Sequence, residues 1–331
     1  MNPKFLLILV MLTFGFSVRA QEGVPVYFDY LADNYYLVYP SMAGIGEGGK
    51  IRLTARKQWF DIQNAPNLQT LNAHFRVGDN SGVGGILYND SNGYHSQTGL
   101  KLTYAHHLKL SYDFRTLHQL SFGLSTGVTM STLDETEFRS VAPDPLISGQ
   151  RNSVAYFNID LGVSYNIFEF YAHAAVLNVL GAGRDLYTVQ ESDNLRRYLF
   201  SMGYVFGRKS LRIEPSVLLQ VSDFTRERAL DLNAKVYKDV GNSTIWGGLS
   251  YRRSFNGASF NTGTTAGEQR LQLFTPIAGV NFGRMLFSYN YSYQVGDIRF
   301  ADGGFHQITI GYDIGQNNKN RYDCFCPAAN Y

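Results

Sequence analysis

The sequence predicts an all-β fold, a transmembrane antiparallel β-barrel of the outer-membrane type with about 14 strands. From Lys50 to Ile314, apolar and polar residues alternate in segments of about ten to fifteen residues, as expected of strands with two different faces. Only 17% of the residues are charged, against about a quarter in an average soluble domain. After residue 20 no run of about eighteen apolar residues occurs, which excludes a helical membrane protein.

The first element is a predicted secretory signal peptide, residues 1–20. Lys4 precedes the apolar run Phe5–Leu12, and Ala20 ends the segment, which is the layout of a signal peptide. The mature chain would begin at Gln21, and we expect no lipid anchor because that position is not Cys. The first 20 residues carry two basic and no acidic side chains, so the remainder is formally neutral. A neutral chain offers nucleic acid no overall attraction, and nucleic acid is excluded as a partner.

The second element, residues 21–49, precedes the first strand and is rich in Tyr. It contains Tyr39-Pro40 and ends in a Gly-rich stretch. Two interpretations stay open for this N-terminal segment: a periplasmic leader, or a segment that enters and plugs the lumen.

The third element is the transmembrane β-barrel, residues 50–315. Segments of this length suit tilted strands that cross a membrane better than the five or six residues of a typical globular strand. An even number of strands closes an antiparallel barrel with both termini on one side. The predicted strands are residues 50–60, 68–77, 83–89, 98–111, 119–132, 154–166, 169–179, 197–206, 211–221, 228–238, 244–254, 269–282, 285–296 and 305–315.

The connections alternate between longer and shorter ones, apart from the short gap 222–227. This alternation predicts long loops outside the cell and short turns in the periplasm, so that both termini are periplasmic. The predicted long loops are 61–67, 90–97, 133–153, 180–196, 255–268 and 297–304. Pro215 and Pro276 lie inside predicted strands, and because each lacks a backbone donor we expect a bulge or weak pairing there. Residues 316–331, which include Cys324 and Cys326, form a predicted periplasmic tail of uncertain role.

The polar face of the predicted strands points into the lumen. Both charge signs occur on it, which favours ion pairs across strands over an ion filter of one sign. The predicted lumen-facing residues are Arg52, Thr54, Arg56, Asn72, His74, Arg76, Asp160, Arg212, Glu214, Asp231 and Lys235.

A catalytic or metal-binding constellation is not evident in the sequence. His106 and His107 are adjacent, so on a strand they point to opposite faces and cannot ligate one metal together. The other histidines are scattered without ligand spacing, and no Gly-x-Ser-x-Gly motif occurs. We therefore expect no catalytic residues, no metal and no cofactor.

Three stretches near the N-terminus carry a family resemblance: Tyr39–Gly44, Leu53–Trp59 and Ala65–Thr70. They resemble the PorP/SprF family of type IX secretion membrane proteins, in which an Asn-Pro-Ala-like turn ending in Ala-Gly precedes a strand with an Arg-x-Gln-Trp motif and then a Gly-Ala-Pro-x-x-Gln-Thr turn. Tyr39 stands where the family usually has Asn, and Asn64 where it usually has Gly. Later stretches follow the family pattern in the same order, namely Leu120–Gly127, Glu214–Leu219, Asp231–Ala234, Trp246–Arg252 and Phe305–Tyr312.

The resemblance implies an integral outer-membrane barrel without enzymatic activity that works with the type IX secretion and gliding machinery. It implies three partners: a secreted protein (adhesin) with a type IX C-terminal domain, other type IX secretion components, and outer-membrane lipid. Loops on a rigid wall carry recognition, and aromatic and Arg residues suit hot spots. The predicted partner-binding residues are Phe138, Arg139, Tyr187, Phe255, Phe260 and Arg299.

Three other classes stay open for this sequence. A channel for a small or hydrophobic solute is the main alternative, because a barrel of about 14 strands is wide enough for a lumen. A lipid-modifying enzyme of the outer membrane is a second. A water-soluble β-sandwich is a third, although its strands would be about half as long.

Overall fold

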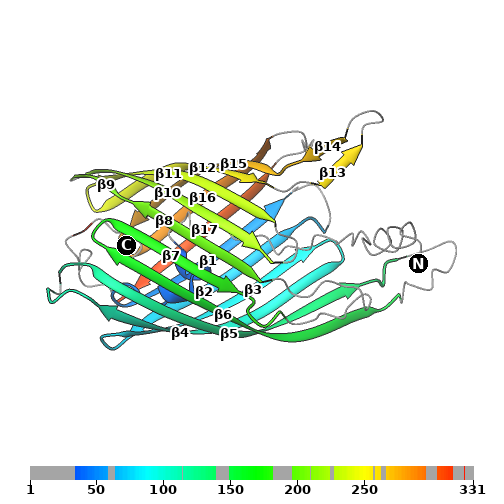
Figure 1. Ribbon diagram of the computed structural model, residues 1–331, viewed down its shortest axis with the longest axis horizontal. Coiled ribbons are helices and arrows are strands. Elements are labelled where there is room, and N and C mark those ends of the chain that lie inside the picture. Colours follow the sequence, from blue (N-terminus) through cyan, green and yellow to red (C-terminus); the bar gives the residue numbers. More distant parts are fainter. Residues whose placement is uncertain are drawn as a thin grey trace, which may run out of the picture.

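A closed antiparallel β-barrel forms the protein (Figure 1). The computed structural model describes residues 34–58, 64–113, 115–138, 149–181, 196–208, 210–223, 227–255, 258–261, 266–295, 304–315 and 324. The predicted signal peptide, residues 21–33 and, except for Cys324, the C-terminal tail lie outside the described residues.

Fourteen strand positions make up the wall, as predicted. β8 and β9 occupy a single position, because both pair with β10 and only Val205 separates them. The wall strands are β1 (Gly49–Gln58), β2 (Asn67–Val77), β3 (Ser81–Asn92), β4 (His95–Lys109), β5 (His118–Asp134), β6 (Arg151–Ile167), β7 (Phe170–Leu177), β8 (Arg197–Tyr204), β9 (Phe206–Arg208), β10 (Leu211–Ser222), β11 (Arg228–Val240), β12 (Ser243–Ser254), β15 (Gln272–Phe282), β16 (Met285–Val295) and β17 (Phe305–Ile314).

Closure of the wall comes from the pairing of the first strand with the last. β1 pairs with β17 along its whole length, from Gly49 opposite Ile314 to Gln58 opposite Phe305. Every one of the fourteen strand positions therefore has a neighbour on both sides. A closed wall suits a bilayer, because hydrocarbon offers no hydrogen-bond partner to the free edge of a sheet.

The lengths of the connections between strands distinguish the two ends of the barrel, which we call the turn end and the long-loop end. Turns 78–80, 168–169, 241–242 and 283–284 lie at the turn end, together with the somewhat longer connection 110–117. At the long-loop end, β5 leads to β6, β7 to β8, β12 to β15 and β16 to β17.

One predicted loop was wrong, and another contains an element that was not predicted. The predicted loop 90–97 is a two-residue turn, because the β3–β4 ladder continues to Asn92 opposite His95. The run of Asn, Asp and Ser in this region is typical of a loop, but polar residues can pair normally in the part of a strand that lies beyond the hydrocarbon of the membrane. The predicted loop 255–268 contains the additional hairpin β13 (Ala258–Asn261) and β14 (Ala266–Gln269).

Weak pairing at both prolines is confirmed. Opposite Pro215, the ladder with β10 is interrupted between Gly203 and Phe206, which is where β8 and β9 are separated. At Pro276, the register with β16 passes from Phe274 to Ile277 without a pair for the residues between them. Each break has the same cause, since proline has no N–H to donate.

The two faces of the wall are inverted relative to a soluble protein. In β1, Arg52 and Thr54 are 2% and 1% exposed, whereas Leu53 between them is 49% exposed. In β4, Leu102 is 58% exposed beside the buried Thr103. Large apolar side chains on the outside and polar ones on the inside fit a lipid-facing wall. Among the described residues, no helix has the length and apolar character needed to span a membrane.

A short stretch of chain before β1 lies inside the barrel. It contains the 3₁₀ turns η2 (Tyr35–Leu37) and η3 (Pro40–Met42), and every residue from 34 to 46 is buried. η3 contacts β4, β5 and β6. This stretch and the inward-facing apolar residues of the wall form the hydrophobic cluster of the barrel.

Candidate functional site

The interior of the wall is a buried polar surface, and it is the first candidate site. Among the predicted lumen residues, eight charged or histidine side chains and two neutral ones are buried. They are Arg52, Thr54, Arg56, Asn72, His74, Asp160, Arg212, Glu214, Asp231 and Lys235. Arg76 is half-buried and donates from Nη1 to the carbonyl oxygens of Gly44 and Ile45.

Oppositely charged side chains on neighbouring strands form ion pairs along this interior. Arg252 binds Asp231 through two hydrogen bonds of 2.6 Å, from Nε and from Nη2. Arg52 lies 2.8 Å from Asp313, and Arg212 lies 2.6 Å from Asp239. Paired in this way, the buried charges avoid the large cost of an isolated ion in a low-dielectric interior.

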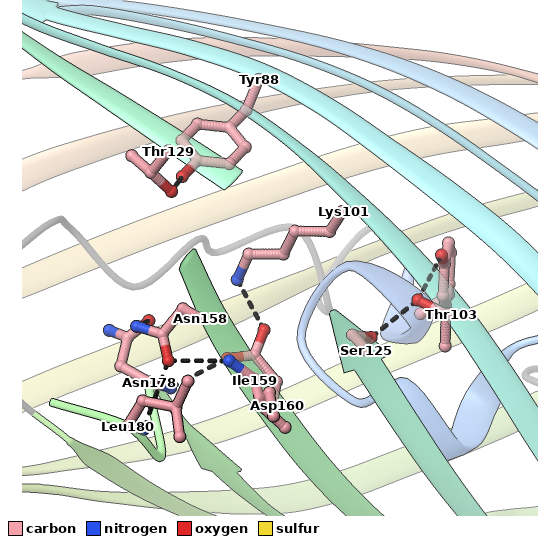
Figure 2. A network of polar contacts seen from close by, with 11 residues as sticks. Tyr88, Lys101, Thr103, Ser125, Thr129, Asn158, Ile159, Asp160, Asn178 and Leu180 are labelled. Carbon is pink, nitrogen blue, oxygen red and sulfur yellow. Dashed lines mark hydrogen bonds and ion pairs between the residues drawn. The ribbon is translucent and has the colours of Figure 1, made fainter. Parts of the chain in front are cut away.

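Asp160 of β6 centres a polar network at mid-wall (Figure 2). Its Oδ2 accepts from Lys101 Nζ at 2.6 Å, and its Oδ1 accepts from the Asn178 N–H at 2.8 Å. Lys101 lies on β4, two strands away, and reaches across β5 over Gly127, where a Cβ would meet the Lys101 side chain at 2.8 Å. Asn158 adds bonds to Asn178 and to the Leu180 N–H. The network therefore ties residues 178–180, just past β7, to β6.

Glu214 lies at the centre of a second cluster, nearer the turn end, and is 0% exposed. Its carboxylate accepts hydrogen bonds from the hydroxyls of Tyr35 (3.0 Å), Tyr237 (2.6 Å) and Tyr171. Lys235 Nζ lies 3.4 Å from Glu214 Oε2. Three hydroxyl donors and one cation satisfy this buried carboxylate, and one of the donors belongs to the chain stretch inside the barrel.

The chain stretch inside the barrel makes further polar contacts with the wall. The Gly44 N–H donates to His74 Nδ1 at 2.9 Å, and His107 Nε2 lies 2.9 Å from the Ala43 carbonyl oxygen. The Tyr36 hydroxyl donates to Thr103 Oγ1 at 2.8 Å. Burial raises the pKa of Tyr36 well above its ordinary value, so the hydroxyl keeps its proton.

A cation also stacks on an aromatic ring near the long-loop end. The Arg56 guanidinium lies 4.0 Å from the centre of the Phe305 ring, a cation–π distance. Arg56 is in β1 and Phe305 begins β17, and the two strands are neighbours.

Three of the predicted partner-binding residues, Phe138, Phe255 and Phe260, are described, and they lie at the long-loop end. Phe138 packs edge-on against Tyr94, with ring centres 4.6 Å apart. Phe255 is 46% exposed at the end of β12. Phe260 lies in the β13–β14 hairpin. Arg139, Tyr187 and Arg299 lie outside the described residues.

Several partners in the interior network were not predicted from the sequence, namely Lys101, Arg252, Tyr171 and Tyr237. The alternation itself could have identified two of them. Outward-facing Leu100 and Leu102 place Lys101 on the inner face, and outward-facing Leu249 does the same for Arg252. Within the described part of the chain, no group of three or more His, Cys, Asp or Glu side chains is placed to hold a metal ion.

Comparisons with known proteins agree with this geometry. The family model "Type IX secretion system membrane protein PorP/SprF" matches residues 19–312. None of the curated proteins matches the chain.

Solved structures with a similar fold are outer-membrane barrels. The CymD monoaromatic hydrocarbon channel has a TM-score of 0.50 at 10% identity, with 84% of this chain and 91% of that chain covered. The Acinetobacter baumannii outer membrane protein Omp33 has a TM-score of 0.45 at 8% identity, with 82% and 99% covered. At such identities the CymD likeness shows the fold alone.

Proposed function

The chain belongs to the PorP/SprF family of type IX secretion system membrane proteins, and from this membership we propose that it binds the C-terminal domain of a secreted surface protein. Binding supports the export of that protein or its retention at the cell surface. The observation that carries the proposal is the family match over residues 19–312, which includes nearly the whole barrel. The family is one of membrane barrels and not of enzymes, and we propose that this member is not an enzyme.

The long-loop end is the proposed contact surface, with the long loops outside the cell and the turns in the periplasm. Its support is chemical. Phe255 is half-exposed there, Phe138 packs on Tyr94, and the β13–β14 hairpin adds a further element between β12 and β15. Aromatic and Arg side chains held on a rigid wall suit a protein interface.

A pull-down from membranes of the native host tests this function. The tagged full chain should recover an exported protein that carries a type IX C-terminal domain, and cells lacking the barrel should release that protein into the medium. Failure to recover such a protein, together with normal surface retention in the deletion strain, would contradict the proposal. Phospholipid hydrolysis by the purified barrel would contradict its non-enzymatic part.

A further inference from the structure

The feature that carries a further inference is the chain stretch inside the barrel, residues 34–48, which we call the inner segment. A stretch this short has no core of its own, yet every residue from 34 to 46 is buried. The surface that buries it must therefore come from the barrel wall.

The wall is shaped to receive the inner segment. Inward-facing glycines lie where the main chain of the segment approaches most closely. A Cβ at Gly82 would lie 2.1 Å from the Ala43 carbonyl oxygen, and one at Gly123 would lie 2.2 Å from the Ser41 nitrogen. A Cβ at Gly162 would meet Pro40 and Ser41 at 3.0 Å. Since real Cβ atoms do not approach backbone this closely, a larger residue at Gly82 or Gly123 would displace the segment.

Polar contacts fix the inner segment on several sides of the lumen. Ser41 Oγ lies 2.6 Å from Ser164 Oγ on β6. Gly44 binds His74 on β2, Tyr36 binds Thr103 on β4, and Tyr35 binds Glu214 on β10. Contacts thus extend from β2 through β7 and on to β10, so the segment crosses the lumen and does not follow one strand.

All of these contacts lie toward the turn end. Gly82 is the second residue of β3, Tyr171 is the second residue of β7 and Glu214 is the fourth of β10. The far end of the segment meets the end of β17, where a Cβ on Gly48 would lie 2.0 Å from the Ile314 carbonyl oxygen.

We propose that the inner segment is a stationary plug that closes the turn end of the barrel, so that the protein does not conduct solutes through its lumen. The proposal does not depend on the identity of any cargo. A stationary plug distinguishes this barrel from an open channel of the same fold. In a channel, the inner segment would have to lie outside the lumen or be able to leave it.

Planar-bilayer recordings of the purified full chain test closure. We expect no persistent open level above the bilayer baseline in potassium chloride. A steady open level in the wild-type protein would overturn the proposal.

A cysteine pair tests whether the segment stays in place. Ser41→Cys with Ser164→Cys, in a Cys324→Ser, Cys326→Ser background, should form a disulfide on oxidation, because the two hydroxyl oxygens already lie 2.6 Å apart. The matched control pair is Thr132→Cys with Ser153→Cys, whose hydroxyls lie 2.9 Å apart on β5 and β6 within the wall. Conductance should stay at baseline in both the oxidised and the reduced protein. The stationary plug would be overturned if the control pair formed its disulfide and the Ser41–Ser164 pair did not. It would also be overturned if a conducting pore appeared only after the disulfide was reduced.

Thiol labelling gives a readout that depends on neither conductance nor disulfide geometry. In the same cysteine-free background, Ser41→Cys alone should react with a bulky water-soluble maleimide at least about tenfold more slowly than Tyr112→Cys, since it is shielded unless the segment opens. Ser41 is 0% exposed, and Tyr112 is fully exposed on the 110–117 connection. Equal labelling rates in a folded barrel would overturn the proposal.

Discussion

The two ends of the lumen are built differently. At the turn end, a piece of main chain fills the interior and rests on glycines of the wall. From mid-wall toward the long-loop end, the described interior is held by side chains that pair across strands, such as Lys101 with Asp160 and Arg252 with Asp231. Close packing of the main chain against glycines permits only one position of the inner segment. Ion pairs between wall side chains place no such constraint on the loops at the other end of the barrel. This difference fits the proposal that the turn end maintains the barrel and that recognition takes place at the long-loop end.

The largest effect is expected from Glu214→Ala at the turn end. The substitution leaves Lys235 and the hydroxyls of Tyr35, Tyr171 and Tyr237 buried without their acceptor. We expect the free energy of unfolding to fall by about 3–5 kcal/mol. Guanidinium unfolding in detergent, followed by tryptophan fluorescence, measures the change, because Trp246 packs near Tyr237. Labelling of a cysteine at position 41 should also accelerate, since Tyr35 loses its anchor. A loss below about 1 kcal/mol would contradict the assigned role of the carboxylate.

A smaller loss is expected from Asp231→Asn, nearer the long-loop end. The amide keeps one acceptor for Arg252 but removes the countercharge, and we expect a loss of about 2–3 kcal/mol. Labelling at position 41 should not change, which distinguishes this pair from Glu214. The control is Asp223→Asn, whose pair with Arg196 is 3.7 Å long and more than a third exposed on both sides. The control should change stability by no more than about 0.5 kcal/mol; equal losses in both variants would contradict the distinction between buried and surface pairs.

The alternation in the sequence predicted the wall because lipid and lumen impose opposite demands on successive residues. Leu53 between Arg52 and Thr54 is sufficient to orient β1. Alternation carries no information on where a polar strand ends beyond the membrane, and for this reason the predicted loop 90–97 was wrong.

The partners of the interior residues were harder to predict. The pair of Asp231 with Arg252 can be predicted only if the β11–β12 register is known. The pair of Lys101 with Asp160 can be predicted only if it is known that Gly127, which has no side chain, lies between them. The donors to Glu214 come from the inner segment, β7 and β11, which only the closed barrel brings together. The Tyr-rich composition of residues 21–49 left a leader and a plug equally open, since composition does not give contacts.

A moderate effect is expected from Gly123→Ala, which adds one methyl group at the seat of the inner segment. Because its nearest neighbours are backbone atoms of Pro40 and Ser41 at 2.2 Å, the segment or β5 must shift, at a cost of about 1–2 kcal/mol. The matched control is Gly85→Ala, where the nearest atom lies 3.7 Å away. Guanidinium unfolding of both variants checks the prediction, and an equal response at the two glycines would contradict the close seating of the plug.

The smallest effect on stability is expected at the long-loop end, from Phe255→Ala. The side chain is 46% exposed, so the free energy of unfolding should change by no more than about 0.5 kcal/mol. Capture of the exported C-terminal domain should nevertheless weaken by about tenfold, the cost of removing an aromatic hot spot. Phe282→Ala is the control at the opposite end of the barrel, where an equally apolar side chain is 64% exposed on β15. Titrating the captured domain against both variants checks the prediction. If Phe282→Ala weakens capture and Phe255→Ala does not, recognition belongs to the turn end, and the division of roles between the two ends is reversed.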